Sequence, residues 1–582
     1  MASLALSWST TTPSVKPSPL PPHFPTKTAT RARPLTISCK AADDDTETSS
    51  DLAKLDRRNL LLGAGGLSGA AAAHILSRGP PALATPITSP DLSKCSTGTN
   101  LNTQQPLDIS CCLPNSFDVS DYKLPSVTKM RVRPAAHLAG KDYFAKYEKA
   151  LSLMKSLPDD DPRSFTQQAN IHCAYCNLIY PQTGGAPDSK LQIHNCWHFY
   201  PWHRWYLYFY ERILGKLIDD PTFAIPFWNW DHPDGMIMPE EFARRGSPLF
   251  DARRNQKHLP PALADLAYSA RSATRPDRIV SNNLTVMYTE MVRNVSRLED
   301  FYGARYAVGT APDPGPGTVE RGSHASMHSW VGEDTPTGED MGNFYSTGRE
   351  PLFYSHHANI DRLWSVWRGL PKKPGKSSRD FPDEPDWLRA DYLFYDEEGR
   401  LVRVTNADTL ETERMGYVYQ DVALPWLKNR PRPRNKKSKA AAATGAPAAA
   451  AAGVFPMRLD KVVKVLVGRP KRSRSKKEKE EEEELLVIEG IEVDTARFVK
   501  FDVFVNDEDD KPDELDKAEY AGCYAQVPHK NSMKVKSKIR LGLTELLEDL
   551  EVEGDDKILV TLVPKAGGED ITIGGIKIIY AS

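Results

Sequence analysis

Residues 171–212 decide the fold and the chemistry of this chain, and they read IHCAYCNLIYPQTGGAPDSKLQIHNCWHFYPWHRWYLYFYER. This stretch concentrates four of the 14 histidines of the chain. A second concentration follows in residues 324–357, which contain HASMH and FYSHHANIDRLW. Imidazole is a ligand for copper, zinc, iron and nickel. Two imidazole-rich clusters without an equally regular set of carboxylates therefore predict a pair of metal ions.

The first cluster combines two predicted helices with a loop. His172 and Cys176 are four positions apart in a segment of helical periodicity, so they should share one helix face. A second helix is expected to begin at Pro201, a residue that suits the first position of a helix, and to carry His203 in its first turn. His194 precedes this proline in a loop, which allows it to converge with His203.

The second cluster has helical spacing throughout. His324 and His328 are four apart, as in a two-histidine metal clamp on one helix turn. The segment FYSHHANIDRLWSVW is predicted to form the helix that brings His357 as a third ligand. Asp361 lies on the same helix face as His357, whereas His356 lies about 100° away around the helix.

The ligand types restrict the metal chemistry. A di-iron carboxylate site would show Glu-x-x-His pairs, which are not seen at matching spacing. A single catalytic zinc needs only three histidines. Two neighbouring groups of three imidazoles suit a copper pair that binds O2 and cycles between Cu(I) and Cu(II). A structural zinc protein and an oxygen carrier with the same copper pair are the rival interpretations.

The length of 582 residues and the changes in composition along the chain indicate three or four structural units. Residues 85–375 and 376–429 should form a mainly helical domain, an antiparallel bundle with long loops around the metal site. Residues 430–455 are basic and Ala/Pro-rich, which is typical of an exposed, protease-accessible linker. Residues 456–582 alternate apolar side chains with Gly turns, which predicts an antiparallel β-sandwich with a charged hairpin loop at 470–485. The net charge of −2 argues against nucleic-acid binding.

Residues 1–84 have the composition of a two-stage targeting segment. The beginning is rich in Ser, Thr, Pro and Ala, with basic and no acidic residues, as in a plastid transit peptide. Arg57 and Arg58 then precede a Gly/Ala-rich stretch that ends in the small-x-small pattern of residues 82–84, typical of a twin-arginine signal. We expect passage into the thylakoid lumen by the twin-arginine export machinery, a mature chain that starts near Thr85, and no permanent membrane span.

Cysteines are crowded into the first half of the chain, which favours an oxidising compartment or metal ligation. Cys95, Cys111, Cys112 and Cys173 can form two bridges. The adjacent Cys111 and Cys112 favour bonds to two different partners over a bond to each other.

Four motifs resemble those of plant polyphenol oxidases, the catechol oxidase and tyrosinase family of type-3 copper enzymes: HCAYC, LQIHNCWHFYPWHRWYLYFYE, HASMH and GNFYSTGREPLFYSHHANIDRLW. Three later blocks also resemble this family, namely DWL at 386–388, YVY at 417–419 and KFDV at 500–503. The resemblance covers essentially the whole chain. It implies a latent proenzyme whose C-terminal domain shields the copper cavity until a protease acts. Residues 521–530 are the expected plug.

The resemblance also implies the role of each site residue. Copper A would be held by His172, His194 and His203, and copper B by His324, His328 and His357. The family's covalent links would fall on a Cys176–His194 thioether and on the disulfides Cys95–Cys112 and Cys111–Cys173.

Two further positions match family residues that act on the substrate. Phe344 would be the gate over copper A, and Glu320 would hold a water molecule in the active site. Asp361 is our candidate for a carboxylate that orients its helix behind the ligands. His198 and Cys196 are additions to the copper A segment, and we interpret them as a packed histidine and a buried free thiol.

The implied activity is that of a catechol oxidase, with phenolic substrates and O2 as reactants. Ala325 occupies a place where members with strong monophenolase activity often carry Asn, and alanine cannot hydrogen-bond a water molecule. This favours oxidation of o-diphenols to o-quinones, with weak hydroxylation of monophenols at most. A biosynthetic hydroxylase or aurone-type synthase of narrow specificity is the alternative within the same family.

Overall fold

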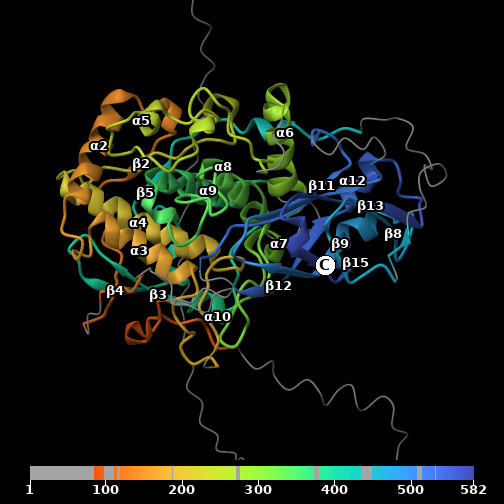
Figure 1. The fold of residues 1–582 in the computed structure, drawn as a ribbon, viewed down its shortest axis with the longest axis horizontal. Coiled ribbons are helices and arrows are strands. Elements are labelled where there is room, and N and C mark those ends of the chain that lie inside the picture. The colour runs from red at the N-terminus through yellow and green to blue at the C-terminus, as the bar shows by residue number, and fades with distance from the viewer. Residues whose placement is uncertain are drawn as a thin grey trace, which may run out of the picture. The chain divides into compact units, whose positions relative to one another are not determined.

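The computed structural model describes residues 84–97, 111–114, 118–186, 188–269, 275–371, 379–433, 449–451, 453–507, 514–530 and 533–581 (Figure 1). The expected transit peptide and twin-arginine signal lie outside these residues, apart from residue 84. Within the described part of the chain, no helix is both long and apolar enough to cross a bilayer. Helices dominate as far as residue 370 and strands dominate after residue 456.

Four α-helices and one π-helix carry the histidine clusters: α3 (Phe165–Cys176), α4 (Phe199–Leu217), η6 (Glu320–His324), α8 (Ala325–Val331) and α9 (Pro351–Gly369). The Ser164 hydroxyl caps α3 by accepting from the Gln167 N–H, and Glu350 caps α9, which has proline at its first position. These side chains explain why the two helices begin where they do.

Shorter or more peripheral helices complete this part of the chain. The α-helices are α2 (Lys141–Lys155), α5 (Glu240–Ala243), α6 (Pro276–Tyr288), α7 (Leu298–Tyr302) and α10 (Pro385–Leu388). The others are η1 (Leu92–Lys94), η2 (Ala136–Leu138), η3 (Pro233–Gly235), η4 (Gln256–His258), the π-helical η5 (Thr289–Arg293), η7 (Thr347–Arg349), η8 (Asn406–Thr409) and η9 (Pro425–Lys428).

Helix α4 lies at the centre of the helical domain, and almost all of its side chains are buried. Its aromatic sequence follows from this position, because a helix covered on every side has no polar face. The rings of Tyr210 in α4 and Tyr354 in α9 stack at 3.6 Å. The expected start at Pro201 is wrong, because α4 already begins at Phe199 and tolerates the proline in its first turn. His203 therefore lies in the second turn.

Small sheets and one disulfide tie the arm before α2 to later parts of the chain, and a second disulfide lies within the arm. Strands β1 (Ser120–Asp121), β4 (Leu401–Thr405) and β3 (Asp391–Tyr395) form one sheet, and β2 (Arg131–Arg133) pairs in parallel with β5 (Tyr417–Tyr419). Disulfides join Cys95 to Cys112 and Cys111 to Cys173, which are the two pairs implied by the family resemblance. The second bond attaches the arm to α3 beside His172.

Two sheets form the C-terminal domain and share one apolar core. The first has the order β11 (Tyr520–Gln526), β10 (Val499–Val505), β13 (Lys557–Ala566), β8 (Val463–Gly468) and β6 (Ala449–Ala450). The second has the order β12 (Lys534–Gly542), β9 (Glu483–Asp494), β14 (Ile571–Ile573) and β7 (Met457–Arg458), and β15 (Gly575–Ala581) also pairs with β9. Two short helices, α11 (Lys476–Glu481) and α12 (Thr544–Asp549), and the 3-10 turn η10 (Gly568–Asp570) connect strands.

Two expectations for this region are corrected. Residues 470–485 are not simply a hairpin loop, because Ser475 and Glu478 form a capping box that starts α11. The segment 430–455 is not exposed linker throughout, because β6 at its end pairs in parallel with β8. Its first residue, Arg430, forms an ion pair with Asp549 of the C-terminal domain.

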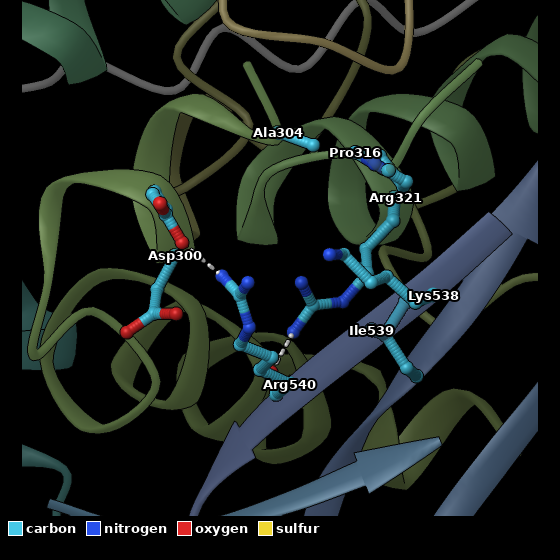
Figure 2. A pocket seen from close by; sticks show the side chains of 9 residues that line it. Asp300, Ala304, Pro316, Arg321, Lys538, Ile539 and Arg540 are labelled. Atoms are coloured by element: carbon cyan, nitrogen blue, oxygen red, sulfur yellow. Dashed lines mark hydrogen bonds and ion pairs between the residues drawn. The ribbon is translucent and has the colours of Figure 1, made fainter. Parts of the chain in front are cut away.

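The C-terminal domain contacts the helical domain through buried polar groups. Arg321 of η6 donates to the backbone oxygens of Cys523 and Arg540, each at 3.1 Å. Figure 2 shows this guanidinium beside Arg540 in a small pocket at the seam of the two domains. Lys500 Nζ donates to Ser326 Oγ at 2.8 Å. The contacted residues Arg321 and Ser326 flank His324, so the seam lies against the second histidine cluster.

Candidate dinuclear metal centre

The first group of imidazoles comes from two helices and the loop between them. Helix α3 supplies His172, α4 supplies His203, and His194 lies in the loop before α4. The ring centroids are 5.3 Å apart for His172 and His194, 5.0 Å for His194 and His203, and 5.7 Å for His172 and His203. Cys176 Sγ, one ring nitrogen of His172 and one of His194 all lie within 4.8 Å of one another. The loop thus brings His194 to both helices.

The second group comes from η6, α8 and α9. His328 Nε2 lies 3.0 Å from His324 Nε2 and 3.4 Å from His357 Nε2. Neutral ring nitrogens that face one another at these distances repel through their lone pairs unless a cation or a proton lies between them. Three convergent imidazoles of this kind are a metal-ligand set.

The two groups adjoin in one buried space. The rings of His203 and His357 stack at 4.2 Å, and those of His194 and His324 lie 6.1 Å apart. Phe199 packs 4.8 Å from the His203 ring and 4.8 Å from the His324 ring. None of the six imidazoles is more than 2% exposed.

Backbone carbonyls fix the tautomer of four of the six rings. The Nδ1···O distances are 2.9 Å for His172 and Phe344, 2.8 Å for His203 and Phe199, 3.1 Å for His324 and Glu320, and 2.7 Å for His328 and Met341. A carbonyl oxygen only accepts, so each Nδ1 carries the hydrogen and each Nε2 keeps its lone pair. The Nε2 atoms of His172 and His203 are buried, and no described residue forms a hydrogen bond with them. This arrangement fits metal ligands oriented from behind by hydrogen bonds.

Burial keeps these imidazoles neutral. The pKa of His203 is lowered to about 3 and that of His328 to about 4, because burial penalises the charged ring. The other four rings have pKa values well below the ordinary range, first through burial and then through neighbouring imidazoles. Neutral imidazole is the form that binds a metal ion, so the folded chain presents its ligands ready for metal.

A segment of the C-terminal domain covers the first group. The Phe344 ring stacks on His194 at 4.0 Å, and the Phe344 N–H donates to the Pro528 carbonyl at 2.9 Å. The His529 ring lies edge-on against Phe344 at 4.8 Å, and its Nε2 is 2.7 Å from Gln192 Nε2. Residues 528 and 529 belong to the segment 521–530 that we expected to be the plug.

Glu320 and Ala325 lie beside the second group. Glu320 is buried, and one carboxylate oxygen accepts from the Asn195 N–H at 2.6 Å, while the other has no hydrogen-bond partner within the described ranges. Burial raises the pKa of this carboxyl well above its ordinary range. Ala325 directly follows His324 and is 2% exposed. The site therefore contains one buried acid with a free oxygen next to an apolar position.

His198 and Cys196 lie away from the ligand sets. His198 Nε2 is 3.0 Å from the Tyr306 carbonyl, and its Nδ1 is 3.2 Å from Asn406 Nδ2. Cys196 is buried and free, and its thiol donates to the Ile193 carbonyl. These contacts are those of a packed, hydrogen-bonded histidine and a structural thiol.

His356 is the residue that the sequence argument missed. One of its ring nitrogens lies within 4.8 Å of ring nitrogens of His324, His328 and His357. The doublet of adjacent histidines was the available signal. An angle of about 100° around a helix separates two side chains in projection, yet it does not keep two long side chains apart when both point toward the same neighbour.

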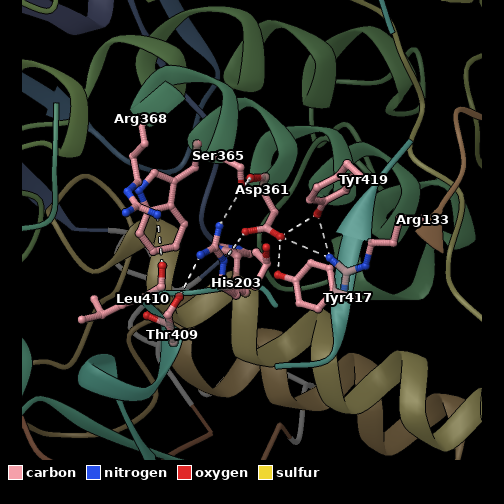
Figure 3. Close-up of polar contacts among 12 residues, drawn as sticks. Arg133, His203, Asp361, Ser365, Arg368, Thr409, Leu410, Tyr417 and Tyr419 are labelled. Carbon is pink, nitrogen blue, oxygen red and sulfur yellow. Dashed lines mark hydrogen bonds and ion pairs between the residues drawn. The ribbon is translucent and has the colours of Figure 1, made fainter. Parts of the chain in front are cut away.

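Asp361 ties the helices behind the ligands together (Figure 3). It lies four residues after His357 and accepts from Arg204 Nε at 2.6 Å and from Arg133 at 3.2 Å. Two tyrosine hydroxyls of β5 also donate to it. Burial alone would raise the pKa of Asp361, but Arg204 and Arg133 hold it below its ordinary range. Since Arg204 follows His203 directly, this carboxylate links a residue beside each ligand group.

We predict that Asp361→Ala lowers the free energy of unfolding of the full chain by about 3–5 kcal/mol, because it leaves Arg204 and Arg133 buried without their shared partner. Urea denaturation measures the effect. Asp121→Ala, which removes an exposed ion pair with Arg403, is the control and should leave stability essentially unchanged. Equal losses for the two variants would contradict the role given to Asp361.

Two facing groups of neutral imidazoles in a helical frame define a dinuclear centre of the type-3 copper class. Residues 162–370 match the common central domain of tyrosinase, 380–432 the polyphenol oxidase middle domain, and 455–580 the chloroplastic polyphenol oxidase C-terminal domain. A chloroplastic polyphenol oxidase of Vitis vinifera is 46% identical over 604 aligned positions, which cover 100% of this chain and 98% of the relative.

Solved structures agree with these matches. A latent apple tyrosinase has 50% sequence identity and a TM-score of 0.75, and the match covers 80% of this chain and 100% of that chain. A latent aurone synthase has 43% identity and a TM-score of 0.80, covering 85% and 99%. The chain belongs to the plant polyphenol oxidase family. Its cofactor is the type-3 copper pair of that family.

Proposed function

We propose that this protein oxidises o-diphenols to o-quinones, with two diphenols and one O2 giving two quinones and two water molecules. In this proposal copper A is held by His172, His194 and His203, and copper B by His324, His328 and His357. A bound copper pair supplies O2 binding and electron transfer. The observation that carries the proposal is the inward set of unprotonated ring nitrogens, fixed by hydrogen bonds from Nδ1 to backbone carbonyls.

A thioether between Cys176 and His194 would restrain one of the two proposed ligands, His194 and His357, whose Nδ1 makes no hydrogen bond to a backbone carbonyl among the described residues. Neither ring nitrogen of His194 has a hydrogen-bond partner in the part of the chain that the structure describes, and the residue comes from a loop. Cys176 Sγ lies within 4.8 Å of a His194 ring nitrogen. A covalent link from the rigid helix α3 would orient the ring where no carbonyl does so.

Aromatic side chains form the wall on which a substrate ring would rest. Phe344 stacks on His194 and is proposed as the gate over copper A. Such walls exclude water, which strengthens every electrostatic interaction in the cavity. A phenol that loses its proton on binding would gain from this, because the site is built from neutral ligands and two cations.

Glu320 and Ala325 are proposed to set the preference for diphenols. The free carboxylate oxygen of Glu320 is available to hold a water molecule. Ala325 offers no side-chain group to orient that water, so assistance in deprotonating a monophenol is weak. Diphenols need only oxidation and are therefore the favoured substrates.

The C-terminal domain is proposed to keep the enzyme latent. Its Pro528 and His529 contact the gate residue Phe344 directly. A substrate would need to occupy the space that this segment covers. Cleavage within residues 430–455 by an activating protease, followed by release of the domain, would uncover the site.

A plastid location is supported by the chloroplastic relative of Vitis vinifera. The Arg57–Arg58 segment supports onward transport to the thylakoid lumen by the twin-arginine machinery. That machinery carries folded cargo, which suits a chain that acquires copper before export.

A second candidate is a biosynthetic hydroxylase or aurone-type synthase of narrow specificity. The similarity to a latent aurone synthase over 85% of this chain favours keeping it. Both activities would use the same copper pair, so only the range of accepted phenols separates them.

The first test compares copper-loaded full-length chain with chain cut within residues 430–455, on a panel of mono- and diphenols. We expect several simple catechols to yield quinones, and the cut enzyme to be faster, because the plug has left. Turnover of a single complex phenol alone would favour the second candidate. A cut enzyme no faster than the full chain would contradict the shielding role.

Ala325→Asn tests the substrate preference in the cut enzyme. An amide beside the water of Glu320 should raise the ratio of monophenol to diphenol turnover, on the order of 10-fold for one added positioning contact. Ala325→Ser, with a shorter polar group, is the matched comparison. An unchanged ratio in Ala325→Asn would show that this position does not assist deprotonation.

We expect the C-terminal domain to inhibit the full chain less at acid pH, because protonation of His529 favours release of the plug. Its pKa, ordinarily 6.5, is lowered to about 3 by burial, so the closed state resists protonation while an open state accepts it. The closed state, with the plug seated against Phe344, is therefore fully favoured above pH 6.5. Below that pH, the ratio of closed to open chains falls by up to about 10-fold per pH unit. Groups that face His529 are Gln192 and Phe344, with His172 and His194 beyond them.

The measurement is the activity of the full chain at pH 4–7, divided by that of the cut enzyme at the same pH. We expect this ratio to rise toward acid pH, and to rise less in His529→Gln, which retains an acceptor for Gln192 without a titrating ring. His137→Gln, which changes a ring that stacks on His232 and not on Phe344, should behave like the wild type. An identical pH response in His529→Gln would contradict the role of His529.

A further inference from the structure

A fourth imidazole lies at the second ligand group. His356 is fully buried, and its ring stacks 5.5 Å from that of His324 at an interplanar angle of 20°. It also lies edge-on to His328 and His357, each at 5.2 Å. By distance alone, His356 belongs with the three proposed ligands of copper B.

Hydrogen bonding distinguishes His356 from those three ligands. The indole N–H of Trp230 donates to His356 Nδ1 at 3.1 Å. An indole nitrogen can only donate, so Nδ1 must present its lone pair. A neutral imidazole has one N–H, and His356 therefore carries it on Nε2. That Nε2 is buried and has no hydrogen-bond partner among the described residues.

This tautomer is the opposite of the one seen in His324 and His328. In those rings Nδ1–H donates a hydrogen bond to a carbonyl oxygen, and Nε2 keeps its lone pair for a metal ion. For His356 to do the same, its Nδ1–H would face the Trp230 N–H at 3.1 Å, which places two donors against each other. A protonated, charged ring would meet the same conflict.

We propose that Trp230 excludes His356 from the ligand set of copper B by fixing this tautomer. The inference rests on the proposed function, because it concerns the copper ligands. A catalytic metal site needs an open coordination position, whereas a closed set of four ligands is typical of a structural site. Trp230 thus preserves room at copper B for O2 and the diphenol, although a fourth imidazole is within reach.

Trp230 therefore acts as a positioning residue: it sets the tautomer of His356 and touches no substrate. Trp230 lies in the loop before η3, far along the chain from the helix that carries His356. Both side chains are fully buried, so water cannot replace the indole N–H. Removal of that one donor frees His356 to take the ligand tautomer.

The experiment uses the copper-loaded full-length chain carrying Trp230→Phe. X-ray absorption should report an additional imidazole on copper, and removal of copper by a chelator should slow on the order of 10-fold, the usual scale of effects from groups behind a metal ligand. The matched control is Trp228→Phe, from the same loop, whose buried indole N–H donates to the Gly235 carbonyl instead. The control should keep the wild-type coordination and release rate.

The double variant Trp230→Phe/His356→Phe should restore both readouts, because no fourth imidazole remains. Unchanged coordination and release in Trp230→Phe would overturn the proposal, as would an effect that persists in the double variant. If Trp230→Phe fails to fold, nitrogen-15 NMR of selectively labelled wild-type histidines decides. Protonated Nε2 and unprotonated Nδ1 in His356 are expected, and the reverse would overturn the inference.

A failure of the proposed function would be seen in a different measurement, the copper content of the wild-type chain. Two copper ions per wild-type chain are required by that function, whatever the tautomer of His356. Fewer than two would contradict the dinuclear centre itself. Two copper ions together with an unchanged Trp230→Phe variant would contradict only the role of Trp230.

Discussion

Neutral imidazoles held in one tautomer are the constraint on which the rest of the structure depends. Six rings can share a buried space at low cost when none is charged and when a cation or a proton lies between the lone pairs that face one another. The chain meets the first condition by burial and the second by directing Nδ1–H groups outward to carbonyls of Phe344, Phe199, Glu320 and Met341. All four of those carbonyls lie in helices or turns, so the secondary structure itself sets the direction of the ligand atoms.

The surrounding framework keeps those carbonyls in place. Asp361 connects the helices of the two ligand groups through Arg204 and Arg133. The disulfide between Cys111 and Cys173 ties the arm to the helix of His172. The C-terminal domain adds contacts beside His324 and against Phe344, the residue whose carbonyl orients His172. The same domain that would block the substrate is therefore also part of the support of the site.

Helical spacing was sufficient to predict α3 and α9, and two concentrations of histidine were sufficient to predict a dinuclear site. The structure brings together all six histidines named from the sequence. Other features depend on contacts between distant segments, which a periodicity does not contain. The proximity of His356 is one, and the donor from Trp230, 126 positions away, is another. The π-helical form of η6 is a third, because it depends on packing around Glu290, whose carboxylate binds the N–H and hydroxyl of Ser323.

Periodicity in the sequence is also insufficient to predict how the C-terminal domain contacts the helical domain. Alternating apolar residues predicted a β-sandwich in residues 456–582, but most of β11 lies within residues 521–530, which we expected only as the plug. Strand β11 is buried on both faces and lacks a clear alternation. This strand contacts the helical domain, and a local sequence pattern does not indicate such contacts between domains.

Anomalous X-ray diffraction at the copper edge, on crystals of the copper-loaded full-length chain, would locate the metal ions and identify their ligands. We predict two copper peaks, one about 2 Å from Nε2 of each of His172, His194 and His203, and the other at the same distance from His324, His328 and His357, with His356 not bound. A single metal ion, or a peak ligated by His356 in place of one of the three, would contradict this prediction.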